Sequence, residues 1–236
     1  MGSQCFECIR ADQPKTAVRI RQTLKRDPLI ATKMLIGLNV ALFAYIYLRD
    51  ATISGNGNTA FNLGLTGPAL QNGDWWRLFT YSTVHFGIVH LGFNMLILWL
   101  VGKTFEPGTG PIRFATIYFV SVLGGAAGAI IATPTALTGG ASGGIFGVAA
   151  AATLVMHRRG IRFWDTGFGP LLVLNLGLGF LEPNISIGGH IGGLIAGALC
   201  AEAMMRARKV NMPALGYVGA AIVGLVSIAV AFYASA

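Results

Sequence analysis

The chain has 236 residues, of which 54% are hydrophobic and only 11% are charged, and its mean hydropathy is +0.64. Soluble globular domains carry about 25% charged residues, so this composition excludes a water-soluble fold, and its apolar content excludes a disordered chain. The net charge of +8 falls in short basic clusters between apolar runs, which is typical of membrane-protein loops rather than of a nucleic-acid-binding surface. The sequence therefore predicts an all-α, polytopic membrane helical bundle.

Apolar stretches of about 20 residues are long enough to span a bilayer, and they follow one another along this chain. We expect the first span at 31–48, and a long glycine-containing connection separates it from the second at 86–105. From Phe114 to His157 there is no Asp, Glu, Lys or Arg, and Pro134 with its neighbouring threonines is expected to divide this stretch into two helices. The remaining predicted spans, which bring the number to seven, are 113–132, 139–157, 167–181, 187–205 and 214–234.

Lysine and arginine alternate between the two sides of the predicted bundle. They occur in the N-terminal tail and in the second, fourth and sixth connections, whereas the third and fifth connections and the C-terminus have none. Because cytoplasmic loops carry the excess of Lys and Arg, we predict a multi-pass protein of the cell membrane with a cytoplasmic N-terminus and an external C-terminus. The cytoplasmic basic residues are Arg10, Lys15, Arg19, Arg21, Lys25, Arg26, Lys103, Arg113, Arg158, Arg159, Arg162, Arg206, Arg208 and Lys209.

Few polar side chains fall inside the predicted spans, and each is a functional candidate because ionisable groups are expensive in hydrocarbon. The second span has His85 at its outer edge and carries His90 and Asn94, which are four residues apart and therefore share one helical face. The fourth span carries Ser142, and the sixth carries His190. All three spans enter from the outside with these residues in their first turns. The side chains should therefore lie at one depth, in a cavity open to the exterior.

Glycines flank the serine and the last histidine at the spacing of small-xxx-small pairs, which lets helix backbones approach closely in lipid. A serine and a histidine on two such faces can come within hydrogen-bond reach, as a nucleophile and its general base require. Three other interpretations stay open at this point: a serine bonded to its own helix, glycine faces that only pack, and haem or metal ligation by the histidines without a supporting carboxylate. The glycines are Gly139, Gly140, Gly143, Gly144 and Gly147 around the serine, and Gly188, Gly189, Gly192, Gly193 and Gly197 around the histidine.

Four motifs of the chain resemble those of the rhomboids, a family of intramembrane serine proteases. Each motif alone is a weak signal, but the four occur in the family's order and on the family's helices. They are Trp76-Arg77, His90-xxx-Asn94, Gly140-Ala141-Ser142-Gly143 and His190-xx-Gly193-xxx-Gly197. The resemblance covers about residues 31–207 and implies a six-helix rhomboid core followed by an additional seventh C-terminal helix.

The resemblance implies a catalytic dyad without an aspartate, in which Ser142 is the nucleophile and His190 the general base. It also implies an oxyanion hole made by His90, Asn94 and the backbone amide of Ser142. Phe146 is expected either to stack on the histidine ring or simply to pack at lipid depth. The other implied roles are non-catalytic: a structural histidine at His85, an anchor of the first connection at Arg77 beside Trp76, and close packing at Gly140, Gly143 and Gly193.

Other intramembrane chemistries lack their required residues. A zinc protease needs H-E-x-x-H, and no Glu follows any of the four histidines. An aspartyl protease needs two carboxylates in one site, and the predicted spans contain no Asp. We therefore predict a serine endopeptidase that cleaves transmembrane segments near the outer face. The alternative is a catalytically inactive, client-binding member of the same family; a small-molecule transporter would show inverted repeats, and none is convincing.

The predicted division is a basic cytoplasmic tail (1–30), a protease core (31–207) and the added helix (208–236). In the tail, Cys5-Phe6-Glu7-Cys8 resembles the last Cys-x-x-Cys of a zinc-binding module that precedes some bacterial rhomboids. A structural zinc needs four ligands and one pair is present, so we expect no metal site and no cofactor. The expected partners are single-pass or multi-pass membrane protein substrates and the lipid bilayer, without nucleic acid, and the oligomeric state stays open.

Overall fold

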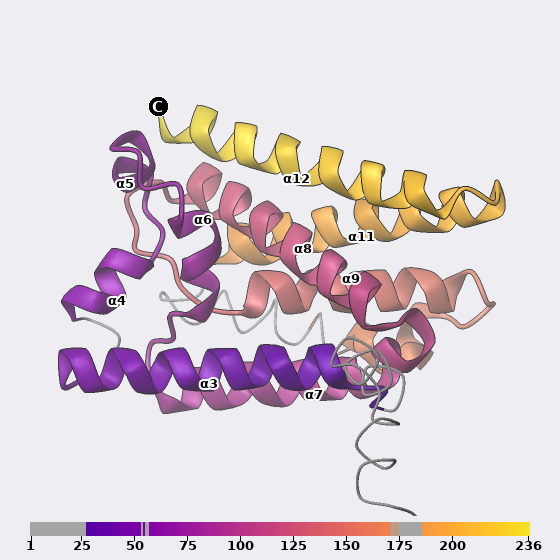
Figure 1. The fold of residues 1–236 in the computed structure, drawn as a ribbon, viewed down its shortest axis with the longest axis horizontal. Helices are drawn as coiled ribbons and strands as arrows, with labels where there is room; N and C mark the ends of the chain where they lie inside the picture. The colour runs from indigo at the N-terminus through magenta and orange to yellow at the C-terminus, as the bar shows by residue number, and fades with distance from the viewer. Residues whose placement is uncertain (1–26, 53, 55–56, 171–172, 174–185) are drawn as a thin grey trace, which may run out of the picture.

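The computed structural model describes residues 27–52, 54, 57–170, 173 and 186–236 (Figure 1). Apart from one isolated β-bridge, the regular structure of these residues is helical, so the prediction of an all-α membrane bundle is confirmed. The described helices that are long and apolar enough to cross a membrane are α3 (Ile30–Asp50), α7 (Ile88–Thr109), α8 (Pro111–Ala132), α11 (Ile187–Lys209) and α12 (Pro213–Ser235).

A shorter apolar helix, α9 (Ser142–His157), corresponds to the predicted fourth span. The helix expected at 167–181 falls largely outside the described residues, and the pair Cys5 and Cys8 falls wholly outside them. The start of α8 at Pro111 and of α12 at Pro213 follows from the fixed backbone angle of proline, which suits a first helical turn.

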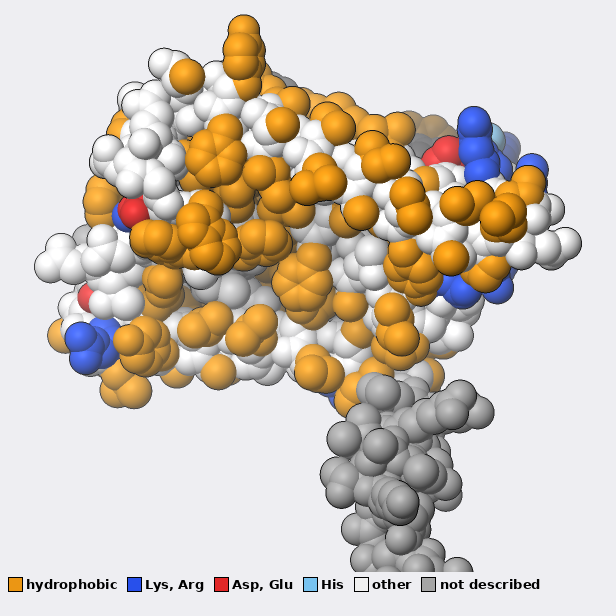
Figure 2. Space-filling model, turned by 45° about the horizontal axis from the view of Figure 1, so that its top comes forward, with side chains coloured by type: hydrophobic (Ala, Val, Ile, Leu, Met, Phe, Trp, Pro, Cys, Tyr) orange, Lys and Arg blue, Asp and Glu red, His pale blue; other side chains and the backbone are white. Residues whose placement is uncertain are grey.

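The bundle is built around α8 and α11. Helix α11 packs against both α8 and α9, while α3 and α7 pair with each other. Helix α12 lies along α8 and α11, on the side of the bundle away from α3 and α7 (Figure 1). Figure 2 shows hydrophobic side chains spread over the sides of the bundle and Lys and Arg gathered towards its ends, as a protein surrounded by lipid requires.

The first connection, expected as a long loop, contains short helices. They are α4 (Asn58–Leu63), α5 (Gly67–Gln71), α6 (Arg77–Thr80) and the 3₁₀ turn η1 (Tyr81–Thr83). Helix α3 runs two residues beyond its predicted end at Leu48, to Asp50. The Asp50 carboxylate accepts hydrogen bonds of 3.0 Å from the backbone N–H groups of Thr59 and Ala60, so it caps the start of α4. An aspartate therefore ends this span, and its role there is structural.

Helix α9 begins at Ser142, three residues later than the sequence predicted. Gly140 has a φ of +127°, which the right-handed helix does not allow and which glycine adopts readily. The 16 residues of α9 extend about 24 Å, less than the roughly 30 Å of a hydrocarbon core. One or both ends of a spanning helix this short lie within the hydrocarbon, where irregular backbone is tolerated only beside protein or a water-filled cavity.

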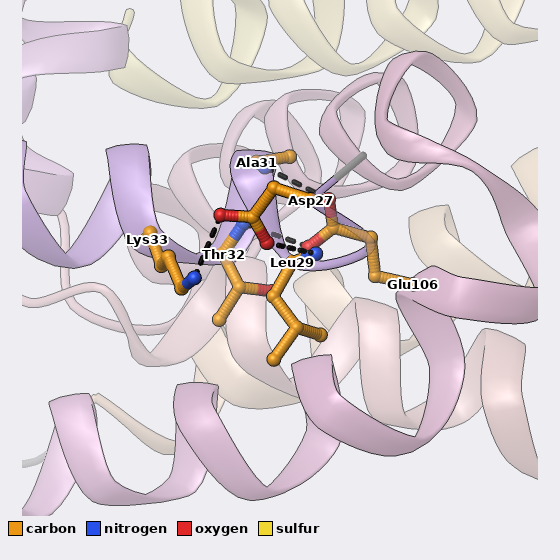
Figure 3. A network of polar contacts seen from close by, with 6 residues as sticks. All are labelled: Asp27, Leu29, Ala31, Thr32, Lys33 and Glu106. Carbon is orange, nitrogen blue, oxygen red and sulfur yellow. Dashed lines mark hydrogen bonds and ion pairs between the residues drawn. The ribbon is translucent and has the colours of Figure 1, made fainter. Parts of the chain in front are cut away.

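A buried carboxylate on α7 joins this helix to the start of α3 (Figure 3). Glu106, near the end of α7, is fully buried and accepts hydrogen bonds from Ala31 N–H (2.8 Å), Thr32 N–H (2.9 Å) and the Thr32 hydroxyl (2.6 Å). The first N–H groups of a helix have no partner within it, so Glu106 supplies the N-terminal cap of α3 from another helix. Leu29 occupies the N-cap position of α3, but its side chain has no hydrogen-bond acceptor and cannot cap the helix.

Replacing Glu106 with Ala is expected to lower the free energy of unfolding by about 2–3 kcal/mol, because it leaves buried donors of α3 without an acceptor. The measurement is thermal unfolding of the purified protein in detergent. Glu202→Ala is the matched control, since Glu202 only makes ion pairs near the surface with Arg158 and Arg206, and such pairs contribute about 1 kcal/mol or less. Equal stability of the two variants would contradict the capping role.

Candidate active site

Helices α9 and α11 touch each other backbone to backbone. A Cβ atom placed on Gly193 would lie 2.1 Å from the carbonyl oxygen of Gly143, and one on Gly197 would lie 2.3 Å from that of Gly147. No side chain fits at these positions, so the glycine faces predicted for the two helices do meet. Ser142 precedes the first of these contacts by one residue, and His190 precedes it by one turn, so both belong to the same level of the helix pair.

The ring of Phe146 links His190 to α9. The two rings are stacked, with centroids 4.1 Å apart and planes 15° from parallel. Phe146 is one turn after Ser142, so this stacking places the histidine over the first turn of α9, which is one of the two arrangements that the sequence left open. His190 is 5% exposed, and its Nδ1 atom is buried without a hydrogen-bond partner among the described residues. Among the described residues, no carboxylate orients the His190 ring through Nδ1. The stacking on Phe146 fixes the plane of the ring instead.

The start of α9 presents backbone donors beside the Ser142 hydroxyl. The first hydrogen bond of the helix runs from Ile145 N–H to the Ala141 carbonyl at 3.1 Å, and the N-cap residue Ala141 has no capping side chain. The N–H groups of Ser142, Gly143 and Gly144 therefore have no partner within α9. These donors and the positive end of the helix dipole favour a negative charge at this point.

His90 faces the same place from α7. Its Nδ1 accepts a hydrogen bond of 3.2 Å from Phe86 N–H, so in the neutral ring the proton is on Nε2. The ideal Cβ position of Gly140 lies 3.0 Å from His90 Nε2 and 3.8 Å from the Ser142 hydroxyl oxygen. The space beside Gly140 is therefore shared by an N–H donor and by the serine, and any side chain larger than hydrogen at 140 would fill it.

Asn94, one turn after His90 on α7, is 6% exposed. Its side-chain amide donates a hydrogen bond of 2.9 Å to the His90 carbonyl within the same helix. A primary amide has two N–H groups, so one remains for a ligand. The structure thus places Asn94 on the same helix face as His90, but part of its donor capacity is used locally, which spacing alone did not indicate.

His85 lies before α7, not within it. Its Nδ1 is 3.2 Å from the Thr83 carbonyl, and its ring contacts the His90 ring edge-on with centroids 5.1 Å apart. Burial, and secondarily the neighbouring His90, lower the pKa of His85 to about 3, so the ring is neutral at physiological pH. A neutral ring packed on His90 agrees with a structural position.

Tyr81 ties the first connection to the start of α9, and the sequence did not single it out. Its carbonyl accepts a hydrogen bond of 2.9 Å from Gly140 N–H, and its hydroxyl donates one of 2.7 Å to the Val122 carbonyl of α8. Burial raises the pKa of Tyr81, so the hydroxyl keeps its proton and remains a donor. A tyrosine in a polar connection carries no sequence signal for this role.

Arg77 organises the first connection, while Trp76 is 41% exposed beside it. The Arg77 guanidinium bonds to the Asp74 carboxylate at 2.9 Å and to the carbonyl of Gly64 at 2.9 Å, and it also lies over the Phe61 ring. These contacts leave the arginine 5% exposed and hold three parts of the connection together. This arrangement agrees with an anchor rather than a substrate contact.

A family model described as Rhomboid domain matches residues 72–208, which is more than half of the chain and contains the residues of the candidate site from Asp74 to Gly197. The chain belongs to the rhomboid family. The resemblance seen in its motifs is thereby confirmed, and the apolar helices make it a multi-pass membrane protein. Within the described residues of this rhomboid, no group of three or more His, Cys, Asp or Glu is arranged to hold a metal ion.

Several curated proteins are similar to this rhomboid. Rhomboid protease GluP of Bacillus subtilis is 32% identical over 227 residues, which cover 94% of this chain and 43% of GluP. The putative rhomboid protease YdcA of the same organism is 32% identical over 145 residues, 60% of this chain and 70% of that protein. RHOMBOID-like protein 7 of Arabidopsis thaliana is 33% identical over 132 residues, 52% of this chain and 42% of that protein. The chain spans less than half the length of GluP.

Proposed function

We propose that this rhomboid is an intramembrane serine endopeptidase that cleaves transmembrane segments of other membrane proteins near the outer face. The observation that carries the proposal is the stacking of His190 on Phe146, which holds over the first turn of α9 a histidine whose Nδ1 has no hydrogen-bond partner among the described residues. The names of the two similar bacterial proteins, a rhomboid protease and a putative rhomboid protease, support the same activity.

The proposed reaction is acyl transfer. Ser142 Oγ attacks the scissile carbonyl carbon while His190 takes the hydroxyl proton, and the carbonyl electrons move to the oxygen. That oxyanion accepts hydrogen bonds from Ser142 N–H, from His90 Nε2–H and from the free N–H of Asn94. Collapse of the intermediate breaks the C–N bond, and His190 gives its proton to the leaving amine. Water then hydrolyses the acyl-enzyme by the same steps, which restores Ser142.

The depth of the site determines the form of the substrate. A transmembrane helix has all of its carbonyls bonded internally, so it must unwind before Ser142 can attack one of them. Segments with small or helix-breaking residues near the outer face meet this requirement most readily. We also infer that residues 31–207 form the protease core and that 208–236 add a helix to it.

The test of the function is covalent labelling by a fluorophosphonate probe, followed by mapping of the modified peptide. An activated serine is phosphonylated and an ordinary one is not, so we expect one modified site, at Ser142. The catalytically inactive, client-binding alternative predicts no labelling of the folded protein, and that result would place it ahead of the protease.

Removing an oxyanion donor should slow turnover without removing the nucleophile. His90→Ala and Asn94→Ala are each expected to reduce the rate of substrate cleavage by about 100- to 1,000-fold, while slow fluorophosphonate labelling persists. The control on the same helix is Thr104→Ala, because the Thr104 hydroxyl bonds only to the Leu100 carbonyl of its own helix. Cleavage by His90→Ala at the wild-type rate would remove His90 from the oxyanion hole.

The proposed orientation rests on the alternation of Lys and Arg between the two ends of the bundle. A reporter fused after Ala236 is expected outside the cell membrane, and one fused at Arg159 is expected in the cytoplasm. The measurement compares an enzyme active only in the periplasm or exterior with one active only in the cytoplasm. Both fusion points on one side would refute the proposed topology.

A further inference from the structure

A cavity lies at the basic end of the bundle, away from Ser142. It has a volume of about 290 Å³ and is formed where α7 and α11 end, where α8 begins, and beyond the last turn of α9. Its walls combine apolar side chains, among them Phe105 and Met204, with four arginines. The arginines that line it are Arg113, Arg158, Arg159 and Arg208.

Among the described residues, few carboxylates neutralise this positive charge. Glu202 bonds to Arg158, and also to Arg206, which does not line the cavity. Within the described ranges, Arg113, Arg159 and Arg208 have no carboxylate partner; Arg113 bonds only to the backbone carbonyl of Thr109. Several cations around one concave surface repel one another unless an anion is shared between them.

We propose that this cavity binds the head group of an anionic phospholipid from the adjoining leaflet. The phosphate would bond to the unpaired arginines, whose planar N–H donors match phosphate oxygens, and the glycerol and first acyl carbons would lie on the apolar wall. Basic pockets between membrane helices on the cytoplasmic side are suited to such lipids. The volume is at the lower end of that of small-molecule sites, so it accommodates a head group rather than a whole lipid.

The apolar wall distinguishes a lipid from a free anion. A site for inorganic phosphate alone would need polar groups on all sides, because burying it against Phe105 and Met204 gains nothing for the ion. A phospholipid is stabilised by both parts of the cavity, because its phosphate bonds to the arginines and its acyl carbons pack on the apolar wall. Arginines that only complemented the carbonyl ends of α9 and α11 would not need a shared concave surface.

The experiment is native mass spectrometry of the purified protein in detergent, titrated with cardiolipin, phosphatidylglycerol, phosphatidylcholine or inorganic phosphate. We expect cardiolipin and phosphatidylglycerol to remain bound to the folded protein and to raise its melting temperature, and phosphatidylcholine and phosphate to do neither. Arg159→Gln and Arg208→Gln should each weaken cardiolipin binding about fivefold, and the triple variant with Arg113→Gln on the order of 100-fold. Arg159 and Arg208 are exposed, so their single variants should fold and report on binding even if the triple variant does not fold.

Arg206→Gln is the matched control. It removes one positive charge two residues from Arg208, on the same helix end but outside the cavity, and should leave cardiolipin affinity within about twofold. An equal loss in Arg206→Gln and Arg208→Gln would show attraction by general surface charge and overturn the site. Equal binding of phosphatidylcholine, or binding of inorganic phosphate that displaces cardiolipin, would overturn it as well.

Discussion

Replacing Ser142 with Ala is expected to reduce cleavage of a membrane-protein substrate by a factor on the order of 10⁴ to 10⁶ and to abolish fluorophosphonate labelling. His190→Ala should lose nearly as much, and the double variant should be no worse than either single one, because the nucleophile and its base act as a unit. The measurement is cleavage of a single-pass reporter reconstituted with the protein in lipid vesicles, followed by gel electrophoresis over several hours.

Two control variants separate this effect from general damage to the bundle. Ser121→Ala removes a buried membrane serine whose hydroxyl bonds to the Ile117 carbonyl of its own helix, and His157→Ala removes an exposed histidine at the other end of α9. Both should retain cleavage within a few-fold of wild type. Labelling of Ser142→Ala as strong as that of the wild type would remove Ser142 as the nucleophile.

Replacing Gly193 with Leu is expected to reduce cleavage by about 100-fold or more and to lower the stability of the bundle. The Cβ atom alone would lie 2.1 Å from the Gly143 carbonyl oxygen, so α9 and α11 must separate to admit any side chain. Overpacking of this kind typically costs about 1–3 kcal/mol. A displacement of about 1 Å between Ser142 and His190 can by itself cost on the order of 100-fold in rate.

The matched control is Gly37→Leu, because a Cβ atom on Gly37 in α3 has nothing within 4 Å. It should leave both cleavage and melting temperature close to those of the wild type. Gly193→Ala provides the intermediate case, with a smaller separation of the helices and a smaller loss. Cleavage rates are expressed per folded molecule, as measured by size-exclusion chromatography. Wild-type rate and stability in Gly193→Ala would show that the helices do not need this close approach.

The helical spans could be predicted from the sequence because the length and hydropathy of a segment determine whether it can span a bilayer. The described helices α3, α7, α8, α11 and α12 match the predicted spans to within a few residues, apart from the later end of α7 and α11. The start of α9 was predicted too early, because a run of glycines is compatible with both a helix and a turn. Only the positive φ of Gly140 identified the turn.

The candidate site residues could be selected from the sequence because polar groups are rare in these spans and their spacing is regular. His90, Asn94, Ser142 and His190 were selected from the sequence, and the structure brings the elements that carry them together. The sequence predicted that the glycine faces of α9 and α11 meet, but it did not indicate that glycines of α8 also contact α11. There, a Cβ on Gly128 would lie 2.2 Å from the Gly188 carbonyl oxygen, so α8 approaches α11 as closely as α9 does.

The sequence by itself therefore determined the membrane class, the positions of the long described helices and the family, since these depend on composition, length and motif spacing. The tertiary structure alone decided three features: the tautomer of His90, the attachment of the first connection through Tyr81, and the capping of α3 by Glu106. Each depends on a hydrogen bond between segments far apart in the chain or on a local contact that periodicity does not encode. The spacing of residues along one helix shows which of them share a face, but it does not show which residues of another segment that face contacts. The hydrogen-bond partners of these side chains are therefore known only from the packed structure.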